Sequence, residues 1–360
     1  MKIRFYIKTV NVFFRYWLYR RFPKLCSKLG IDTLPFGFYI NVTTSCNLKC
    51  KYCVISKEKS TGFPNWHKKK EKTVSWNLLV KAINECAEMS VPFVSITGGE
   101  PLLIKNIYKI GRLAGEKGII TNLNTNGLLI NIENASLLAR SFDYIRISLN
   151  GSKEIHDKLT GVKGSYDRTL EAMKMLMNIK NKRAKVGINC ILNKSTINML
   201  PQFVRKMQNS ADFIGILPEF SFDQSTGDLA GLNRQELSGL KNKLKEINKI
   251  NKVRPKIHIE NFKLMKPNEC DAGLLYMYMI PNGNVLQCPF VTEKMVLNSV
   301  DYNEEDIGNL NKTPLKIIYK NFKKKKLENC KGCYANCTLE ISRIFNKNIS
   351  YHLVNFNDWL

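Results

Sequence analysis

The chain has 360 residues, 44% of them apolar and 24% charged, so it is long enough for a large core plus a smaller domain and too balanced for wholesale disorder. A formal net charge of +26 suggests nucleic acid as a partner, but the lysines are spread along the sequence and we expect no nucleic-acid substrate. Eleven cysteines without a secretory signal exclude a secreted disulfide scaffold and predict metal binding in the cytoplasm.

The first segment, residues 1–35, is basic and aromatic, and no acidic residue occurs among its first thirty. No stretch of it approaches the roughly 20 uninterrupted apolar residues that a membrane-spanning helix needs. The pattern predicts a basic amphipathic helix that lies in the headgroup region of an anionic membrane or packs on the outside of the next domain. Peripheral membrane contact through residues 1–30 is slightly favoured.

A predicted strand over residues 36–43 leads into a loop with three cysteines, Cys46, Cys50 and Cys53, and with Tyr52 directly before the third. Three thiolates can hold three corners of a [4Fe-4S] cluster and leave the fourth iron open, whereas closed clusters normally take four. An open iron implies chemistry at the cluster. The alternative is a zinc knuckle, for which His67 is the nearby fourth ligand.

A second motif follows a predicted helix over residues 75–89 and a predicted strand over residues 91–97. The strand ends in the sequence Gly98-Gly99-Glu100-Pro101. With the cysteine spacing upstream, it resembles the GGEP motif of the radical S-adenosylmethionine (SAM) superfamily. The resemblance implies that the three cysteines are the catalytic cluster ligands and that the amino and carboxylate groups of SAM chelate the open iron.

The resemblance also implies the reaction. One electron from the reduced cluster would cleave SAM, and the resulting 5'-deoxyadenosyl radical would abstract hydrogen from a substrate. The protein would orient the reactants and exclude water. A reductase such as flavodoxin or ferredoxin would supply the electron.

Strands and helices alternate from residue 36 to residue 225. Further helices are predicted over 104–117, 132–141, 165–180 and 195–208, and further strands over 119–124, 144–149, 185–192 and 212–217. Such alternation predicts an α/β fold with a parallel sheet, whose functional loops follow the carboxyl ends of the strands. Six units correspond to a partial (β/α)6 barrel, the fold that the resemblance also implies.

The resemblance assigns SAM-binding roles to Tyr52 of the cysteine motif and to residues at these strand ends. Gly98 and Gly99 would let the backbone approach the methionine group, and Glu100 would accept from its amino group. Ser148 and Asn150 resemble the family's Ser-x-Asp pair near the ribose, with an Asn that keeps an acceptor but loses the charge.

Three other residues receive more open interpretations. Asn126 is a candidate for the SAM pocket or simply caps its turn. Thr160 stands where relatives commonly place an Arg, so we assign no residue there to the SAM carboxylate and expect Thr160 in a loop. Cys190 shares every second position of its strand with apolar residues, Val186, Ile188 and Leu192, which favours a core position over a thiol in the barrel.

The remaining chain is predicted to hold a helical linker over 226–262, a small Cys-rich α+β domain over 263–345 and a tail over 346–360. Two short β-rich runs flank Pro281-Asn282-Gly283, a strong hairpin signal. Cysteines on both sides of this hairpin resemble the Twitch or SPASM extensions of radical SAM enzymes, which bind an auxiliary [4Fe-4S] cluster. The ligands implied are Cys270, Cys288, Cys330 and Cys333, with Cys337 as an alternative fourth ligand or a free thiol. A zinc ribbon would satisfy the same spacing.

The substrate class follows less directly from the sequence than the fold and the cofactors do. The basic aromatic N-terminus favours a sugar, a lipid-linked compound or another small metabolite. A peptide-modifying maturase is the alternative, disfavoured because the residues before the core are too few for the winged-helix module that such enzymes often carry. A basic metal-binding protein that engages nucleic acid is the third hypothesis.

Overall fold

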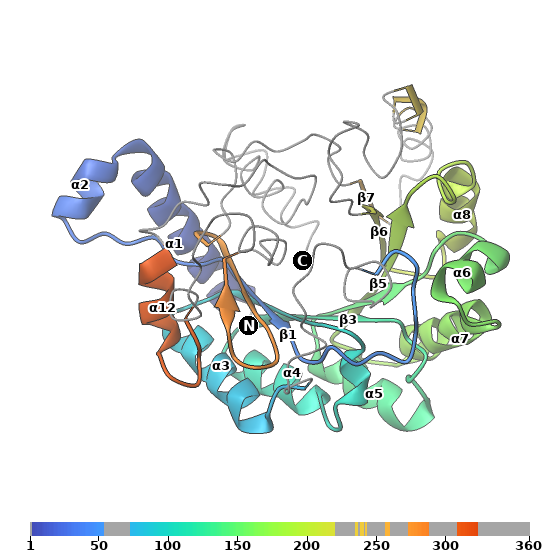
Figure 1. Cartoon of the computed structure of the whole chain (residues 1–360), viewed down its shortest axis with the longest axis horizontal. Helices are drawn as coiled ribbons and strands as arrows, with labels where there is room; N and C mark the ends of the chain where they lie inside the picture. The colour runs from blue at the N-terminus through green and yellow to red at the C-terminus, as the bar shows by residue number, and fades with distance from the viewer. Residues whose placement is uncertain are drawn as a thin grey trace, which may run out of the picture.

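The structure is a computed structural model that describes residues 2–53, 73–219, 256–259, 273–287 and 308–322, together with 235, 236, 238–240 and 242. Figure 1 shows a curved sheet whose one side is covered by helices. The strands are β1 (Gly37–Asn41), β2 (Phe93–Thr97), β3 (Ile120–Thr125), β4 (Tyr144–Ser148), β5 (Lys185–Leu192), β6 (Phe213–Pro218), β7 (Lys256–Ile259), β8 (Tyr276–Met279) and β9 (Val285–Leu286). The helices are α1 (Lys2–Arg21), α2 (Pro23–Lys28), α3 (Trp76–Glu88), α4 (Tyr108–Glu116), α5 (Ile132–Ser141), α6 (Lys153–Thr160), α7 (Ser165–Asn178), α8 (Leu200–Met207) and α12 (Leu315–Phe322), with a short 3-10 helix η1 (Pro101–Leu103).

The sheet order is β7-β6-β5-β4-β3-β2-β1-β8-β9, and every neighbouring pair from β7 to β8 is parallel. The six predicted strands of the core are confirmed, and they lie side by side in chain order. Because β1 pairs with β8 and not with β7, the barrel is unclosed. The predicted partial (β/α)6 fold is therefore confirmed.

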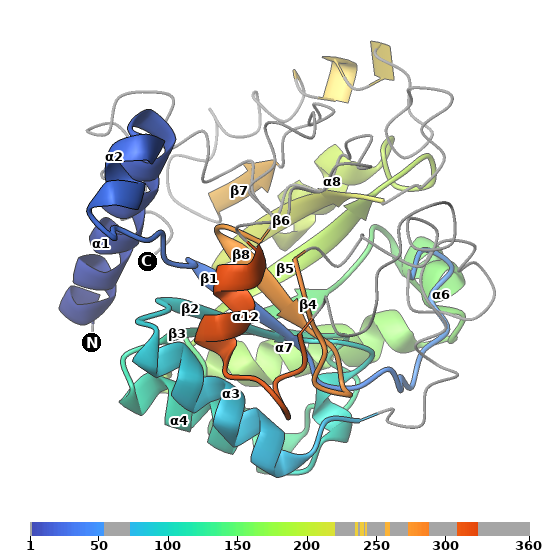
Figure 2. The same ribbon diagram turned by 60° about the vertical axis from the view of Figure 1, so that its left-hand side comes forward.

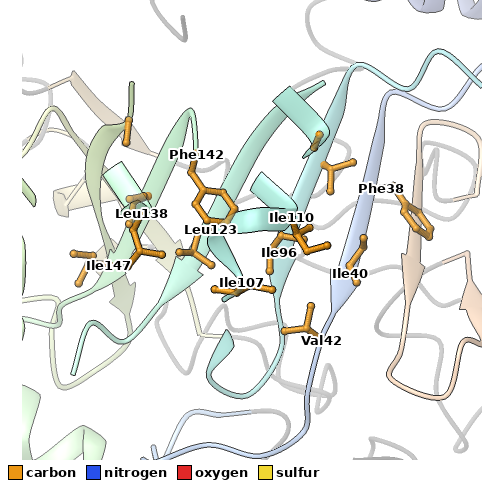
Figure 3. Close-up of a cluster of buried hydrophobic side chains, with 14 of the residues drawn as sticks. Phe38, Ile40, Val42, Ile96, Ile107, Ile110, Leu123, Leu138, Phe142 and Ile147 are labelled. Carbon is orange, nitrogen blue, oxygen red and sulfur yellow. The ribbon is translucent and has the colours of Figure 1, made fainter. Parts of the chain in front are cut away.

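The core lies between the sheet and the helices α3, α4, α5 and α7 (Figure 1). Alternate residues of each strand point toward these helices, because successive side chains of a strand face opposite sides. Figure 3 shows how side chains of neighbouring strands meet those of the helices behind them. The fully buried side chains of this layer include Phe38, Ile40, Ile96, Ile110, Leu123, Leu138, Phe142 and Ile147.

Cys190 belongs to this core layer, which confirms its predicted position. Burial raises the pKa of its thiol to about 12, so the group stays protonated and unreactive at neutral pH. Cys26 and Cys86 are also buried, in α2 and α3.

Helix α1 packs against the other side of the sheet, near the amino ends of the strands. Its residues Val12, Phe13 and Tyr16 are buried in a second apolar cluster with Phe36 and Tyr276 among others. The Lys8 Nζ donates to the carbonyl of Lys117, 3.2 Å away in the turn before β3. One face of the predicted amphipathic helix therefore docks on the core, as the packing alternative required.

The predicted hairpin is also confirmed, as β8 and β9 pair antiparallel around Gly283. It joins the main sheet through β1, so part of the chain assigned to the 263–345 domain extends the core. In both views, α12 lies beside α3 and close to β8 (Figure 2). The Tyr319 hydroxyl of α12 donates to the carbonyl of Leu274, 2.8 Å away, which fixes the hairpin from outside.

Three details of the secondary-structure prediction are wrong. The 226–262 segment, predicted as a helical linker, contains strand β7 at its end, where the isoleucines of Lys256–Ile259 favour a strand. The helices α4 and α8 begin four to five residues later than predicted; Asn106 with φ 63° precedes α4, and Pro201 lies in the first turn of α8. Thr160, expected in a loop, ends α6 and is buried.

Thr160 fits a helix end because its hydroxyl finds partners there. It donates to the carbonyl of His156, 2.9 Å away, and lies 2.7 Å from the Ser165 hydroxyl. Gly161 then ends the helix with φ 74°, a conformation that glycine adopts without steric cost.

Candidate active site

The loop with the three cysteines follows β1 and is held by the GGEP turn that follows β2. The Gly99 amide donates to the Thr43 carbonyl at 2.6 Å, and the Glu100 amide donates to the Ser45 carbonyl at 2.9 Å. A Cβ atom on Gly99 would lie 2.1 Å from the Ser45 oxygen, and one on Gly98, where φ is 137°, would lie 2.6 Å from the Thr43 oxygen. Only glycines allow this approach.

Glu100 ties the GGEP turn to the end of β3. Its carboxylate is fully buried and accepts from the Leu102 amide at 2.9 Å, the Thr125 hydroxyl at 2.7 Å and the Asn126 amide at 2.8 Å. Burial raises its pKa, and these donors oppose the shift. The carboxylate thus fixes two of the predicted site turns against each other.

Asn126 reaches the first cysteine of the loop. Its Nδ2 lies 3.8 Å from Cys46 Sγ and donates to Asn47 Oδ1 at 2.7 Å, while its Oδ1 accepts from the Leu128 amide at 3.0 Å. The capping interpretation of Asn126 is therefore confirmed, and the other end of its side chain faces the cysteine loop.

The three thiols lie near enough to influence one another's ionisation. Burial, followed by the neighbouring Cys53, raises the pKa of Cys50 to about 12, and burial also raises the pKa of Cys46. Within the described residues, no three Cys, His, Asp or Glu side chains are already arranged to hold a metal ion.

The donor set fits a [4Fe-4S] cluster. The described part of the site offers three thiols on one loop, and Cys46 is exposed. Thiolates are the usual ligands of such clusters, and the positive charge of iron would compensate for the cost of ionising half-buried thiols. His67, the fourth ligand of the zinc alternative, lies outside the described residues.

Tyr52 and Asn150 meet behind the cysteine loop. Asn150, fully buried at the end of β4, donates from Nδ2 to the Tyr52 hydroxyl at 2.9 Å, and its Oδ1 accepts from the Ile191 amide at 2.8 Å. The Asn150 amide donates to Nδ1 of buried His156 at 3.1 Å. The contact with Tyr52 and the acceptor role of His156 carry no pattern that the sequence could reveal.

Ser148 lies at the end of β4 on the side of the sheet that faces away from the helices α3, α4, α5 and α7. Further polar side chains lie on this side, where the Asn122 and Asn124 amides donate to the Ser95 hydroxyl at 2.9 and 3.2 Å. The sequence predicted the strands but not this polar row. The recurrence of asparagine two positions apart, at Asn122 and Asn124 in β3, is the signal that could have indicated it.

The predicted auxiliary-cluster ligands lie outside the described residues. Gln287, the residue after strand β9, is the last described residue before Cys288. The undescribed ligands are Cys270, Cys288, Cys330, Cys333 and Cys337.

Comparisons with known proteins identify the family of the core and its fold. The family described as the Radical SAM superfamily matches residues 40–207. Fe-coproporphyrin III synthase of Methanosarcina barkeri is 28% identical over 72% of this chain and 62% of the relative's length. PqqA peptide cyclase of Bradyrhizobium diazoefficiens is 25% identical over 71% of this chain and 67% of the relative.

Among solved structures, Streptococcus suis SuiB bound to S-adenosylmethionine superposes with a TM-score of 0.64 at 19% identity, over 83% of this chain and 69% of that one. SuiB has also been solved with the precursor peptide SuiA. At this identity the likeness concerns the fold, which agrees with the unclosed parallel sheet. Fold, motif and family match together show that residues 40–207 form a radical SAM superfamily enzyme domain.

Proposed function

We propose that this protein is a radical SAM enzyme that modifies a peptide. The observation that carries the first half of the proposal is the junction of the cysteine loop with the GGEP turn, held by the amides of Gly99 and Glu100. It places three thiols beside backbone and amide groups at the carboxyl ends of β1, β2 and β3, the edge where parallel sheets carry function.

In this proposal, Cys46, Cys50 and Cys53 hold the [4Fe-4S] cluster. When bound, the cluster and SAM supply reductive cleavage of SAM and the hydrogen abstraction that follows. Gly98, Gly99, Glu100, Asn126, Ser148 and Asn150 are the proposed SAM-contacting or supporting groups. The electron comes from a reductase such as flavodoxin or ferredoxin.

The peptide substrate rests on the relatives. One is named as a peptide cyclase, and the structural neighbour SuiB has been solved with its precursor peptide. They favour the alternative of the sequence analysis over the sugar or lipid-linked substrate expected there. A small-molecule substrate remains the second candidate, since another relative is named Fe-coproporphyrin III synthase.

The proposed function includes one auxiliary [4Fe-4S] cluster on Cys270, Cys288, Cys330 and Cys333. The cysteine spacing and the hairpin β8–β9 support this auxiliary cluster. Cys270 and Cys288 lie on either side of the hairpin in the sequence, and the other three cysteines follow it. Iron per chain measures it: Cys330→Ala should lose about half of the reconstituted iron, as should Cys50→Ala. A Cys330→Ala variant with the iron content of the wild type would contradict the auxiliary cluster.

The substrate test uses the anaerobically reconstituted, chemically reduced protein with SAM. Synthetic peptides encoded by short reading frames beside the gene form one arm, and a peptide-depleted extract of small metabolites forms the other. The proposal expects a peptide to raise 5'-deoxyadenosine formation and to change mass. Stimulation by the metabolite arm alone would reject the peptide and support the second candidate.

We also propose that the outer face of α1 and α2 contacts an anionic membrane surface, in the cytoplasm. In the described part of the chain no helix is long and apolar enough to cross a membrane. The side chains of Ile7, Val10, Phe14 and Trp17 recur at helical spacing and are 43% to 65% exposed, on the face opposite the docked one. Exposed Arg21, Lys24 and Lys28 follow, without an acidic residue before Asp32.

Vesicle sedimentation tests this surface. The wild type should bind phosphatidylserine-containing vesicles more than phosphatidylcholine vesicles, and Phe14→Ser with Trp17→Ser should abolish the difference. Ile132→Ser is the matched control, because Ile132 is 88% exposed on α5. Equal binding by all three proteins would refute the membrane contact.

A further inference from the structure

Three polar side chains form a patch on the inner face of the sheet, the face that points away from the helices α3, α4, α5 and α7. This inner polar patch consists of Asn122 in β3, Arg146 in β4 and Asn189 in β5. Their apolar neighbours along the strands belong to the core beneath those helices, namely Leu123, Ile145, Ile147, Ile188 and Cys190. Because successive side chains of a strand face opposite sides, the three polar residues lie on the inner face.

The patch runs diagonally across three parallel strands. Arg146 pairs with Asn124 and with Gly187, whereas Asn122 lies two residues before Asn124 and Asn189 lies two residues after Gly187. With strands about 4.8 Å apart and a rise of about 3.3 Å per residue, the Cα atoms of Asn122 and Asn189 are roughly 16 Å apart. An extended peptide of about five residues spans this distance.

An aromatic ring holds the guanidinium of Arg146 in the centre of the patch. The Arg146 Cζ lies 5.2 Å from the centroid of the Phe213 ring, which packs edge-on against Tyr144 at 6.1 Å. The Phe213 ring lies over Gly187, where an added Cβ would be 2.2 Å from a ring atom, so a glycine is needed there. A cation–π contact uses the charge of the guanidinium and not its N–H donors, whose fork fits the two oxygens of a carboxylate.

Two buried amide oxygens beside Arg146 have no hydrogen-bond partner among the described residues, Asn122 Oδ1 and Asn189 Oδ1. Asn122 is 3% exposed, and its Nδ2 already donates to the Ser95 hydroxyl. Asn189 Oδ1 lies 3.1 Å from the place of a Cβ on Gly215. A buried acceptor without a donor costs free energy, so a ligand that donates to it gains affinity.

We propose that the inner polar patch binds an acidic residue of the substrate peptide, whose carboxylate pairs with Arg146 and whose neighbouring backbone N–H groups donate to Asn122 and Asn189. One cation between two acceptors matches one anion between two donors, which an extended peptide with a single Glu or Asp side chain provides. The strands β1 to β9 contain no Asp or Glu, so the sheet itself presents no carboxylate on this face.

The position of the patch suits a substrate of the proposed enzyme. Asn189 pairs with Ser148, one of the proposed SAM-binding residues, and Arg146 lies two residues earlier in β4. Two residues correspond to about 7 Å along a strand. The inference therefore rests on the proposed function and deepens it, since it names the chemical class of the peptide that would lie beside SAM.

Ligand-observed NMR with the reconstituted protein and SAM tests the patch. The probes are the pentapeptide acetyl-Gly-Gly-Glu-Gly-Gly-amide, its counterpart with Gln in place of Glu, and butyrate, a small carboxylic acid without an amide. The wild type should bind the Glu peptide about tenfold more tightly than the Gln peptide. Arg146→Gln should remove this preference, and Arg146→Lys should keep part of it, because it preserves the charge but not the fork of donors. Arg140→Gln, at an exposed position of α5, is the matched control.

A second variant tests the acceptors separately. Asn189→Ala should weaken binding of both peptides and leave the affinity for butyrate unchanged. Peptide affinities equal to those of the wild type would overturn the acceptor role. Butyrate bound as tightly as the Glu peptide would assign the site to a small carboxylic acid and overturn the peptide as its ligand.

The role of Arg146 has its own contradicting result. If Arg146→Gln weakened SAM binding and kept the preference for the Glu peptide, Arg146 would serve the SAM carboxylate and the proposal would be refuted. A wild type without any preference for the Glu peptide would refute it as well. The binding measurement requires no cleavage of SAM, so a lack of 5'-deoxyadenosine formation would refute the proposed function separately.

Discussion

Replacing Gly99 with alanine tests whether the close approach of the GGEP turn to the cysteine loop is necessary. The new Cβ would lie 2.1 Å from the Ser45 oxygen, so that the two chain segments would have to separate by about 0.9 Å to reach 3.0 Å, the lower limit of real Cβ contacts. The separation would weaken the hydrogen bonds from Gly99 to Thr43 and from Glu100 to Ser45. At about 1 kcal/mol each, their loss predicts a destabilisation of about 2 kcal/mol.

Two assays follow from this displacement. Urea denaturation should show the loss of stability, and the reconstituted variant should bind less iron per chain because the loop is displaced from the turn. Gly239→Ala is the control, since nothing lies within 4 Å of its Cβ position. If Gly99→Ala had the stability and iron content of Gly239→Ala, the reasoning about close approach would be refuted.

Two further predictions concern buried groups around the sheet. Asp143→Ala should lower the free energy of unfolding by about 3 kcal/mol, because two donors lose their acceptor: the Arg183 guanidinium, 2.8 Å from Asp143 Oδ1, and the Thr121 amide, 2.8 Å from Asp143 Oδ2. Urea denaturation measures this loss of stability, with the exposed-site variant Ile132→Ser as the control. A loss below about 1 kcal/mol would contradict the estimate. Burial lowers the pKa of His156 to about 4, below the unfolded value of about 6.5, so the unfolded chain binds a proton first and stability falls as the pH drops through that window. Between pH 7 and pH 5, His156 should lower the free energy of unfolding by about 2 kcal/mol. His156→Asn should remove this pH dependence, while the amide oxygen of the new side chain keeps an acceptor for the Asn150 amide. An unchanged pH dependence in the variant would show that the imidazole does not titrate in this way.

Much of the fold could be predicted because local patterns and tertiary packing agree. The strands of the core follow runs of apolar residues, and Ser75, the first residue of the predicted helix, accepts from the Leu78 amide at 3.3 Å and caps α3. What failed were a short strand and a helix end, which a few individual contacts decide. Strand β7 is four residues long, and Thr160 ends a helix because its hydroxyl meets His156 and Ser165.

The candidate site shows the same division. Motif spacing indicated the cysteine loop and the GGEP turn, but not that Gly99 contacts the loop backbone or that Asn126 reaches Cys46. Likewise, no sequence pattern indicated that Asn150 would hold Tyr52, because the two residues lie 98 positions apart. Hydrogen bonds across such separations follow from the packed structure, whereas the residues of a local motif can be read directly from the chain.

The most direct test of the central claim is 5'-deoxyadenosine formation from SAM by the anaerobically reconstituted, chemically reduced protein. The wild type should form it, and Cys50→Ala should not, while Cys190→Ala, which alters only a buried core thiol, should retain the activity. If the cluster-bearing wild type formed none, or if Cys50→Ala formed as much as the wild type, the radical SAM function proposed for this chain would be contradicted.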